Sequence, residues 1–494
     1  MAKEKKRLES VRNAAAGLGR NIADIGRTFA EGSWSTRISF LIMGFGQLVH
    51  RQVLRGVLFL ATEILFIYFM VTFGAQYVIK LPTLGTVATH TDKTGVVPVT
   101  VYGDNSFLIL LYGILSVFVV IAFVYLWRVN IRQNRQIQEL QKEGKSLPVS
   151  MQDLKSLFNK NFDKTLLALP NIGVFVFVIV PIIFMICIAF TNYDADHQPP
   201  SNLFTWVGLT NFRNLFSVGS AGFGSTFFTV LGWTLVWAFF ATFLNYFLGM
   251  GVAILINKKG IKFKKLWRTI LVMTIAIPQF VSLLYVYKMF ADDGLVNSYL
   301  IKWGVIENYI PFWSNATYAR ILIIVINVWI GIPYMMLMAT GILMNIPEDL
   351  YESARIDGAN GFQMFRKITL PYMLFVTGPY LLTSFTNNLN NFNVIYLLTQ
   401  GKPTSMELTG GAGYTDLLIT WLYKLTVNDT NYRMAAVLGI MVFAVTAVIS
   451  LVVYRLLPSV RDEEGFQKWQ IQTERSCSPG AETGKSATES PTLC

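Results

Sequence analysis

The sequence predicts an all-α polytopic membrane protein, and three observations support this fold class. Hydrophobic residues make up 53% of the 494 residues, and charged residues make up only 14%. The mean hydropathy is +0.47, whereas a soluble domain would expose far more charge. The apolar residues also collect in long runs. Such runs indicate helices rather than a barrel, because a helix satisfies its backbone hydrogen bonds within its own segment.

About eight of these runs are long enough to cross a bilayer, which takes about 20 apolar residues in a helix. In chain order they occupy residues 53–79, 106–127, 166–190, 226–256, 269–290, 318–344, 372–398 and 434–457. Residues 37–50 form a shorter apolar stretch, which we interpret as an interfacial segment or a re-entrant lead-in to the first span.

The cations indicate which connections between spans face the cytoplasm. The connection at residues 257–268 holds six lysines and arginines and no acid, the N-terminus is also basic, and Arg455 and Arg461 flank the end of the last span. The positive-inside rule therefore places both termini and the connections 257–268 and 345–371 in the cytoplasm. The net charge of +12 is then a signal of topology. It argues against nucleic-acid binding, because the cations lie at the ends of the spans.

These features divide the chain into four predicted parts. They are a cytoplasmic N-terminal segment (1–36), an accessory membrane region with about two spans and a cytoplasmic loop (37–164), a six-span core (165–460) and a cytoplasmic tail (461–494). The tail is rich in Ser, Thr, Gly and Glu, a composition that is typical of disorder.

No residue pattern indicates a metal site or a bound cofactor. The cysteines, Cys187, Cys477 and Cys494, imply no disulfide framework, and the three scattered histidines imply no metal site. Residues Gly480–Ser486 resemble a phosphate loop, but only three residues separate the two glycines, where the motif has four. We therefore expect that any ATP is bound by another chain.

The connection Pro347–Pro371 is an island of charge between two apolar runs. Pro347 suits a first helical position, with Glu348 and Asp349 in the first turn, where a helix favours negative charge. The pattern predicts two short helices hinged at Asp357-Gly358. A membrane protein has no internal need for such a helix pair outside the bilayer, so we expect another protein to dock there.

Polar residues recur inside three of the predicted spans. Asn327, Gly331 and Tyr334 share one helical face, and Gly331 and Pro333 favour a kink. In the next span, four residues share one face and two amides flank it: Thr377, Ser384, Asn388 and Asn391, with Asn387 and Asn390. Gln279 follows Pro278 in the fifth span, residues 269–290.

Two interpretations of these polar residues stay open. Amides and hydroxyls join membrane helices by hydrogen bonds of about 0.6–2 kcal/mol each. Polar side chains at membrane depth also line paths and sites, and uncharged amides suit a neutral, hydroxyl-rich ligand such as a sugar. Trp329, Tyr334 and Phe392 could stack on a sugar ring, or could be packing and interface anchors.

The charged connection resembles the "EAA" loop of ABC importer permeases. The match comprises Glu352-Ser353-Ala354, Asp357-Gly358-Ala359, Phe365, Ile368, Leu370 and Pro371, with Ser353 in place of the central alanine. The resemblance implies the ABC importer permease fold and a cytoplasmic coupling helix that lies in a cleft of the ATPase subunit. The coupling residues it implies are Glu352, Ala354, Asp357, Gly358 and Ala359.

A narrower resemblance, to the larger permease subunit of maltose/maltodextrin ABC importers, covers the chain from about residue 165. The resemblance is carried by three segments: NVWIGIPYMM, SFTNNLNNFNVIYLLTQGKP and Ala412–Thr426. The eight predicted spans also fit that subunit. The sugar contacts it implies are Asn327, Ile330, Gly331, Tyr334, Ser384, Asn387, Asn388 and Asn391, with Gln279 at the position of a family serine. The chain departs from the family at three positions: the family has a tyrosine where this chain has Ile275, a serine at Gln279 and an aromatic residue at Asn387. The connection 191–225 is also too short for the folded domain that the well-known form of the subunit has there.

The resemblance implies an ATP-driven importer of malto-oligosaccharides in a bacterial cell membrane, and not an enzyme. The implied partners are a second permease subunit, two copies of an ABC ATPase and an extracytoplasmic sugar-binding protein. An importer of another oligosaccharide is the alternative. A secondary transporter is a weaker alternative, because it would need a buried acid to couple transport to protons or sodium, and the spans show no evident one. Glu63 and Asp416 are expected near span ends or in outside loops. A further alternative is a membrane protein that assists assembly and transports nothing. The row of intramembrane asparagines argues against it.

Overall fold

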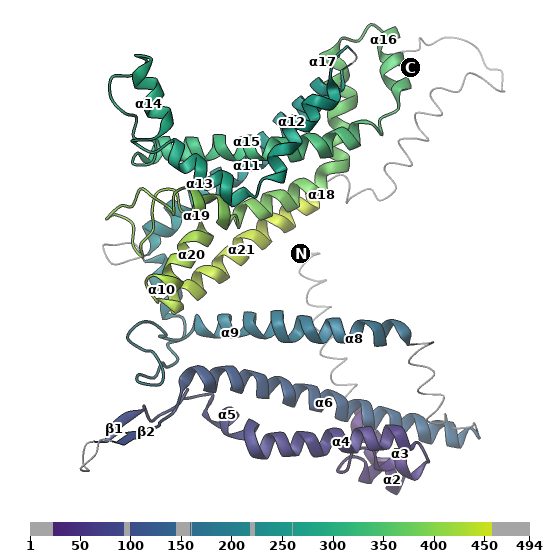
Figure 1. The fold of residues 1–494 in the computed structure, drawn as a ribbon. Helices are drawn as coiled ribbons and strands as arrows, with labels where there is room; N and C mark the ends of the chain where they lie inside the picture. The colour runs from purple at the N-terminus through teal and green to yellow at the C-terminus, as the bar shows by residue number, and fades with distance from the viewer. Residues whose placement is uncertain are drawn as a thin grey trace, which may run out of the picture. The chain divides into compact units, whose positions relative to one another are not determined.

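A computed structural model describes residues 23–92, 99–144, 159, 161–217, 223–258 and 260–456. Almost every regular element in this part of the chain is a helix, and the chain divides into two compact units after Gly208 (Figure 1). The predicted all-α membrane fold is confirmed. Seven helices are long and apolar enough to cross a membrane, and a bent helix pair brings the number to eight.

The first unit consists of long helices that lie side by side. They are α4 (Val53–Phe69), continued by η1 (Met70–Gly74) and α5 (Ala75–Lys80); α6 (Ser106–Lys142); and α8 (Phe162–Val174), continued by η2 (Phe175–Ile179) and α9 (Val180–Ile188) (Figure 1). Stacked rings of Phe66 and Phe123, 3.8 Å between centroids, join α4 to α6. The antiparallel hairpin of β1 (His90–Asp92) and β2 (Val99–Val101) pairs His90 with Val101.

The apolar stretch 37–50 folds as part of two short helices, α2 (Trp34–Ile38) and α3 (Phe45–Val49). The buried amide of Asn130 in α6 accepts hydrogen bonds from Gln47 Nε2 (3.0 Å) and the Gly44 N–H (3.2 Å), and it donates to the Ser39 carbonyl (2.9 Å). Glu63 accepts a hydrogen bond from the Met43 N–H at 2.8 Å. Glu63 therefore lies within α4 and packs against this segment, which corrects its expected place near a span end.

The second unit is built around α11 (Gly224–Asn257) and α15 (Ala316–Leu343), which pack along much of their length. Trp233, Trp237 and Ala241 of α11 form one buried cluster with Ile323 and Ile326 of α15. A second cluster joins Tyr246, Met250 and Ala253 to Met335, Met336 and Met373. The remaining long helices are α18 (Leu370–Leu389) and α21 (Tyr432–Leu456).

Shorter helices lie at the two ends of the second unit. α16 (Glu348–Ile356) and α17 (Gly361–Met364), followed by η3 (Phe365–Thr369), lie at one end. α10 (Thr210–Phe216), α14 (Leu295–Lys302) and α20 (Leu418–Val427) lie toward the other (Figure 1). The connections predicted to be cytoplasmic and extracytoplasmic are thus separated along the unit.

The predicted continuous span 269–290 is wrong. The chain forms α12 (Lys264–Ala276) and α13 (Gln279–Met289), and their axes differ by 91°. Pro278 has no N–H to continue the helix, and it forces Ile277 into an extended conformation with ψ 127°. In contrast, α15 continues through Pro333 without a break.

The predicted span 372–398 is also too long. α18 ends at Leu389, and a new helix, α19 (Phe392–Leu398), begins after Asn391. The Asn391 side chain accepts a hydrogen bond from the Val394 N–H at 3.2 Å, so Asn391 caps the new helix. The asparagines therefore lie at the end of α18 and in the break after it, rather than in the middle of one helix.

The division after Gly208 puts α8 and α9 in the first unit, whereas the sequence groups this span with the six-span core. The four-part division into 1–36, 37–164, 165–460 and 461–494 stays a prediction. Most of the segment 1–36 and the whole tail, with Cys477, Cys494 and Gly480–Ser486, lie outside the described residues.

Candidate functional site

The connection before α18 is a hinged helix pair, as the sequence predicts. α16 follows Pro347, has Glu348 and Asp349 in its first turn, and ends at Ile356, with Asp357 as its C-cap. Gly358 has φ +78°, a left-handed conformation that glycine adopts without the steric cost of a Cβ atom. The Gly358 N–H donates to the Arg355 carbonyl at 3.0 Å, which closes the helix end.

The second helix of the pair, α17, is continuous with α18 through η3. Asn360 and Gln363 form a capping box: the Gln363 N–H donates to Asn360 Oδ1 (2.9 Å), and the Asn360 N–H donates to Gln363 Oε1 (2.8 Å). α17 then continues through η3 into α18. The hydroxyls of Tyr351 in α16 and Thr369 in η3 are hydrogen-bonded at 2.9 Å, so α16 is also held against η3. A push on α16 would therefore be passed on to α18.

The outer surface of this helix pair suits a protein partner. Ile356 is 86% exposed and Phe362 is 71% exposed, and Glu352 and Asp357 are exposed beside them. Exposed apolar residues rimmed by charge are typical of interaction sites. Glu352 and Arg355 form no ion pair with each other or with any other described residue, so both charges face outward.

The polar face of α15 contains one buried amide and one exposed aromatic residue. Asn327 is 7% exposed, and its Nδ2 has no hydrogen-bond partner among the described residues. Ile330 and Gly331 are half-buried, and Tyr334 is exposed. A Cβ atom on Gly331 would lie 2.4 Å from Asn245 Nδ2, so this glycine lets the amide of α11 approach α15.

Asn245 is a polar residue of this region that sequence reasoning missed. Its Nδ2 donates to the Ala241 carbonyl (2.8 Å), and its Oδ1 is buried without a partner in the described part of the chain. Asn245 Oδ1 and Asn327 Nδ2 thus leave an acceptor and a donor unpaired on two packed helices. An unpaired buried polar group is costly, so each would be stabilised by a hydroxyl, which reaches these buried atoms only where α11 and α15 separate. The signal was Thr242, Asn245 and Tyr246 within an otherwise apolar run.

Asn388 makes several hydrogen bonds within the protein. Its Nδ2 donates to Thr242 Oγ1 at 3.0 Å, its Oδ1 accepts from Asn391 Nδ2 at 3.4 Å, and its carbonyl accepts from Trp237 Nε1 at 3.1 Å. These are the contacts of a residue that joins α18 to α11. They favour the helix-joining interpretation for Asn388, and the sugar contact stays a prediction.

Three other predicted contacts lie on two elements, α18 and α13. Ser384 is half-buried on α18. Asn387 is exposed at the end of α18, and Gln279 is exposed at the start of α13, directly after the break at Pro278.

The apolar groove of about 490 Å³ between α13 and α15 is a different surface. Val281, Tyr285 and Met289 line one side, and Leu322, Val325 and Trp329 line the other. Trp329, which could stack on a sugar ring, lines it, but none of the sugar contacts that the resemblance implies does. The groove therefore suits apolar side chains or lipid rather than a sugar.

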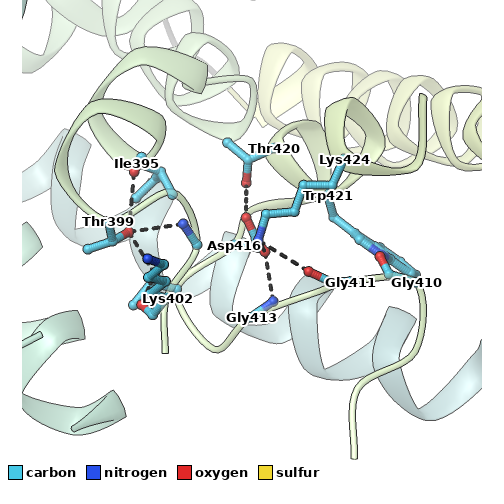
Figure 2. A network of polar contacts seen from close by, with 12 residues as sticks. Ile395, Thr399, Lys402, Gly410, Gly411, Gly413, Asp416, Thr420, Trp421 and Lys424 are labelled. Atoms are coloured by element: carbon cyan, nitrogen blue, oxygen red, sulfur yellow. Dashed lines mark hydrogen bonds and ion pairs between the residues drawn. The ribbon is translucent and has the colours of Figure 1, made fainter. Parts of the chain in front are cut away.

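The connection between α19 and α20 contains a buried ion pair (Figure 2). Asp416 is 0% exposed and accepts from Lys424 Nζ (2.6 Å), the Gly413 N–H (2.7 Å) and Thr420 Oγ1 (2.8 Å). Burial raises the pKa of the Asp416 carboxyl, and Lys424 and the hydrogen bonds oppose that effect. This buried acid was not evident from the sequence. Its cation comes from the same chain, so it fixes this connection onto α20.

The comparisons with known proteins decide the family. A family model described as "Binding-protein-dependent transport system inner membrane component" matches residues 245–462. The maltodextrin transport system permease protein MalC of Streptococcus pneumoniae is 35% identical over 428 residues, which cover 84% of this chain and 94% of that protein. The chain belongs to this family of importer permeases. The galactooligosaccharides transport system permease protein GanP of Bacillus subtilis is 36% identical over 425 residues, 86% of this permease and 97% of that protein.

A solved structure agrees with the fold. A bacterial ABC transporter involved in the import of the acidic polysaccharide alginate aligns with a TM-score of 0.51 at 24% identity, over 63% of this permease and 98% of that chain. The predicted ABC permease fold and the multi-pass membrane location are therefore confirmed. The roles of individual residues stay predictions.

Proposed function

We propose that this permease is the transmembrane subunit of an ATP-driven importer of malto-oligosaccharides and forms the translocation path with a second permease subunit. The observation that carries this proposal is the hinged helix pair α16–α17, exposed on its outer surface and tied to α18. The similarity to the maltodextrin permease MalC along nearly the whole of that protein supports the substrate class.

In this proposal the chain itself does no chemistry and holds no cofactor. Two copies of an ABC ATPase bind ATP and receive the coupling residues Glu352, Ala354, Asp357, Gly358 and Ala359. When the ATPases close, they push α16, and the connection through η3 moves α18. A conformational equilibrium that both ATP and a sugar-loaded binding protein bias then gives alternating access.

The proposed sugar site lies along α15, α18 and the start of α13. Asn327 offers an unpaired donor, and Tyr334 offers an exposed ring. Ser384, Asn387, Asn391, Gln279, Ile330 and Gly331 complete the proposed wall, and we add Asn245 because its Oδ1 is unpaired. Donors and acceptors without charge suit neutral sugar hydroxyls.

A second candidate substrate is a different oligosaccharide. GanP, named for galactooligosaccharides, is as similar to this permease as MalC is. Two of the three departures from the maltodextrin family, Gln279 and Asn387, also lie among the proposed contacts. An ion-coupled secondary transporter is disfavoured by membership of a binding-protein-dependent family.

Uptake by the reconstituted complex tests the proposal. The permease is assembled in liposomes with its second permease and ATPase subunits and supplied with the binding protein. Radiolabelled maltotriose and a galacto-oligosaccharide of the same length are compared, with and without internal ATP. We expect ATP-dependent uptake of maltotriose. Uptake that needs an ion gradient and no ATP would refute the importer, and a preference for the galacto-oligosaccharide would change only the substrate.

Cysteine labelling tests the proposed topology, in which both termini and the helix pair are cytoplasmic. In a background without native cysteines, Lys262→Cys and Asp357→Cys should resist a membrane-impermeant reagent in intact cells. Met406→Cys, at a fully exposed position between α19 and α20, should react. Reaction at position 357 from outside would overturn the topology.

A further inference from the structure

A charged cleft lies between α6 and the helix formed by residues 23–30. It encloses about 310 Å³, and its lining includes Asp24, Thr28, Arg128, Arg132, Arg135 and Glu139. The three arginines recur at i, i+4 and i+7 along α6, which places them on one helical face. The function proposed above uses none of these residues.

The acids of the cleft neutralise only one of its arginines. Arg135 pairs with Glu139 at 2.9 Å and with Asp24 at 3.5 Å. Arg128 and Arg132 have neither an ion-pair nor a hydrogen-bond partner among the described residues, although Arg128 is half-buried. Within the part of the chain that the structure describes, the cleft thus offers two unpaired guanidinium groups, whose planar forks match the oxygens of a phosphate.

The position of the arginines along α6 indicates that the phosphate belongs to a lipid. The apolar run of this helix ends at Trp127, directly before Arg128, and tryptophan and arginine mark the level of the headgroups. One and two turns back on the face of Arg128, Val124 is 47% exposed and Ile121 is 57% exposed. A molecule with its phosphate at the arginines would find an apolar path for acyl chains on the same face.

We propose that Arg128 and Arg132 bind the headgroup phosphate of an anionic phospholipid, with its acyl chains along Ile121 and Val124. Basic pockets between membrane helices on the cytoplasmic side bind anionic headgroups in this way. The bound lipid adds a negative charge beside helix 23–30 and holds that helix against α6. The assignment of the lipid to the cytoplasmic leaflet depends on the proposed topology. The lipid site itself depends neither on that topology nor on the proposed sugar transport.

Lipid binding by the assembled importer tests the proposal. Complexes are exchanged into nanodiscs of phosphatidylcholine with or without phosphatidylglycerol, and lipids retained after transfer to detergent are counted by native mass spectrometry. The test variant is Arg128→Gln with Arg132→Gln. The matched control is Lys262→Gln with Lys265→Gln, which removes two exposed cations from a connection predicted to face the same side.

We expect the unaltered complex to retain phosphatidylglycerol in preference to phosphatidylcholine. The arginine double variant should bind phosphatidylglycerol about thirtyfold more weakly, as expected for two basic residues near a charged membrane surface, and the lysine control should lose little. Equal losses in the two variants would show general attraction to the membrane and overturn the site. Displacement of the lipid by millimolar inorganic phosphate would overturn the lipid and leave a phosphate site.

A second variant guards against misfolding. Arg128→Lys with Arg132→Lys keeps the charge and removes the fork, so it should bind more weakly than the unaltered complex and more tightly than the glutamine variant. Equal binding by the lysine variant and the glutamine variant, with unchanged melting in phosphatidylcholine, would attribute binding to the fork alone. Unchanged lipid retention in both variants would refute the proposal, even if sugar uptake and topology are as proposed.

Discussion

Gly249 lies at a close approach of α11 and α15, and its replacement by alanine tests the packing on which the proposed sugar wall depends. A Cβ atom on Gly249 would lie 2.3 Å from Met335 Cβ and 3.2 Å from the backbone atoms Met335 C and Met336 N. None of these atoms can rotate away. Because carbon atoms in contact are about 3.5–4.0 Å apart, the two helices would have to separate locally by about 1 Å or more.

Gly251, two residues further along α11, is the matched control. A Cβ atom there has no atom within 4 Å. Both substitutions gain about 0.8–1 kcal/mol of helix propensity, but only Gly249→Ala also inserts a methyl group into a packed contact, at a cost of about 1–3 kcal/mol. The difference in free energy of unfolding between the two alanine variants therefore isolates the clash.

Thermal unfolding of the purified permease in detergent measures this difference. We expect Gly249→Ala to melt below Gly251→Ala by several degrees, since about 1 kcal/mol corresponds to about 2–4 °C in a chain of a few hundred residues. Uptake by complexes containing Gly249→Ala should also fall, because α15 holds Asn327 and Tyr334. Equal melting temperatures for the two variants would refute the described approach of α11 and α15.

Three further predictions concern single contacts. Asn388→Ala should lower uptake about ten- to hundredfold if the amide contacts sugar. The control, Thr242→Val, breaks the same interhelical hydrogen bond but keeps the amide. Equal effects of the two variants on both melting and uptake would show that Asn388 only joins the helices. Gly358→Val places a branched side chain at φ +78° and should abolish sugar-stimulated ATP hydrolysis with normal membrane insertion, whereas normal hydrolysis would exclude the hinge as the lever. Lys424→Met leaves Asp416 without its cation and should cost about 3–5 kcal/mol. Because burial raises the pKa of Asp416 in the fold, that loss should grow as the pH rises above about 4, the ordinary pKa of an aspartate, and a melting difference independent of pH would contradict it.

The sequence by itself determined the fold class, the places of seven long apolar helices and the hinged helix pair. Each depends on signals that act within a few residues: the length of an apolar run, the glycine after α16 and the resemblance of one short motif. The hinge at Gly358 could be predicted because a left-handed residue between two helical stretches is a local requirement. The Asn360–Gln363 capping box is equally local.

Only the tertiary structure decided what the polar residues contact. Thr242 and Asn388 are far apart in the sequence, and so are Asn245 and Gly331; nothing local to either member indicates its partner. The 91° turn at Pro278 and the end of α18 at Leu389 were missed because apolar runs continue across both. Hydropathy measures how much apolar surface a segment offers. Where a helix bends, and which amides are left unpaired, depends on the helices packed against it.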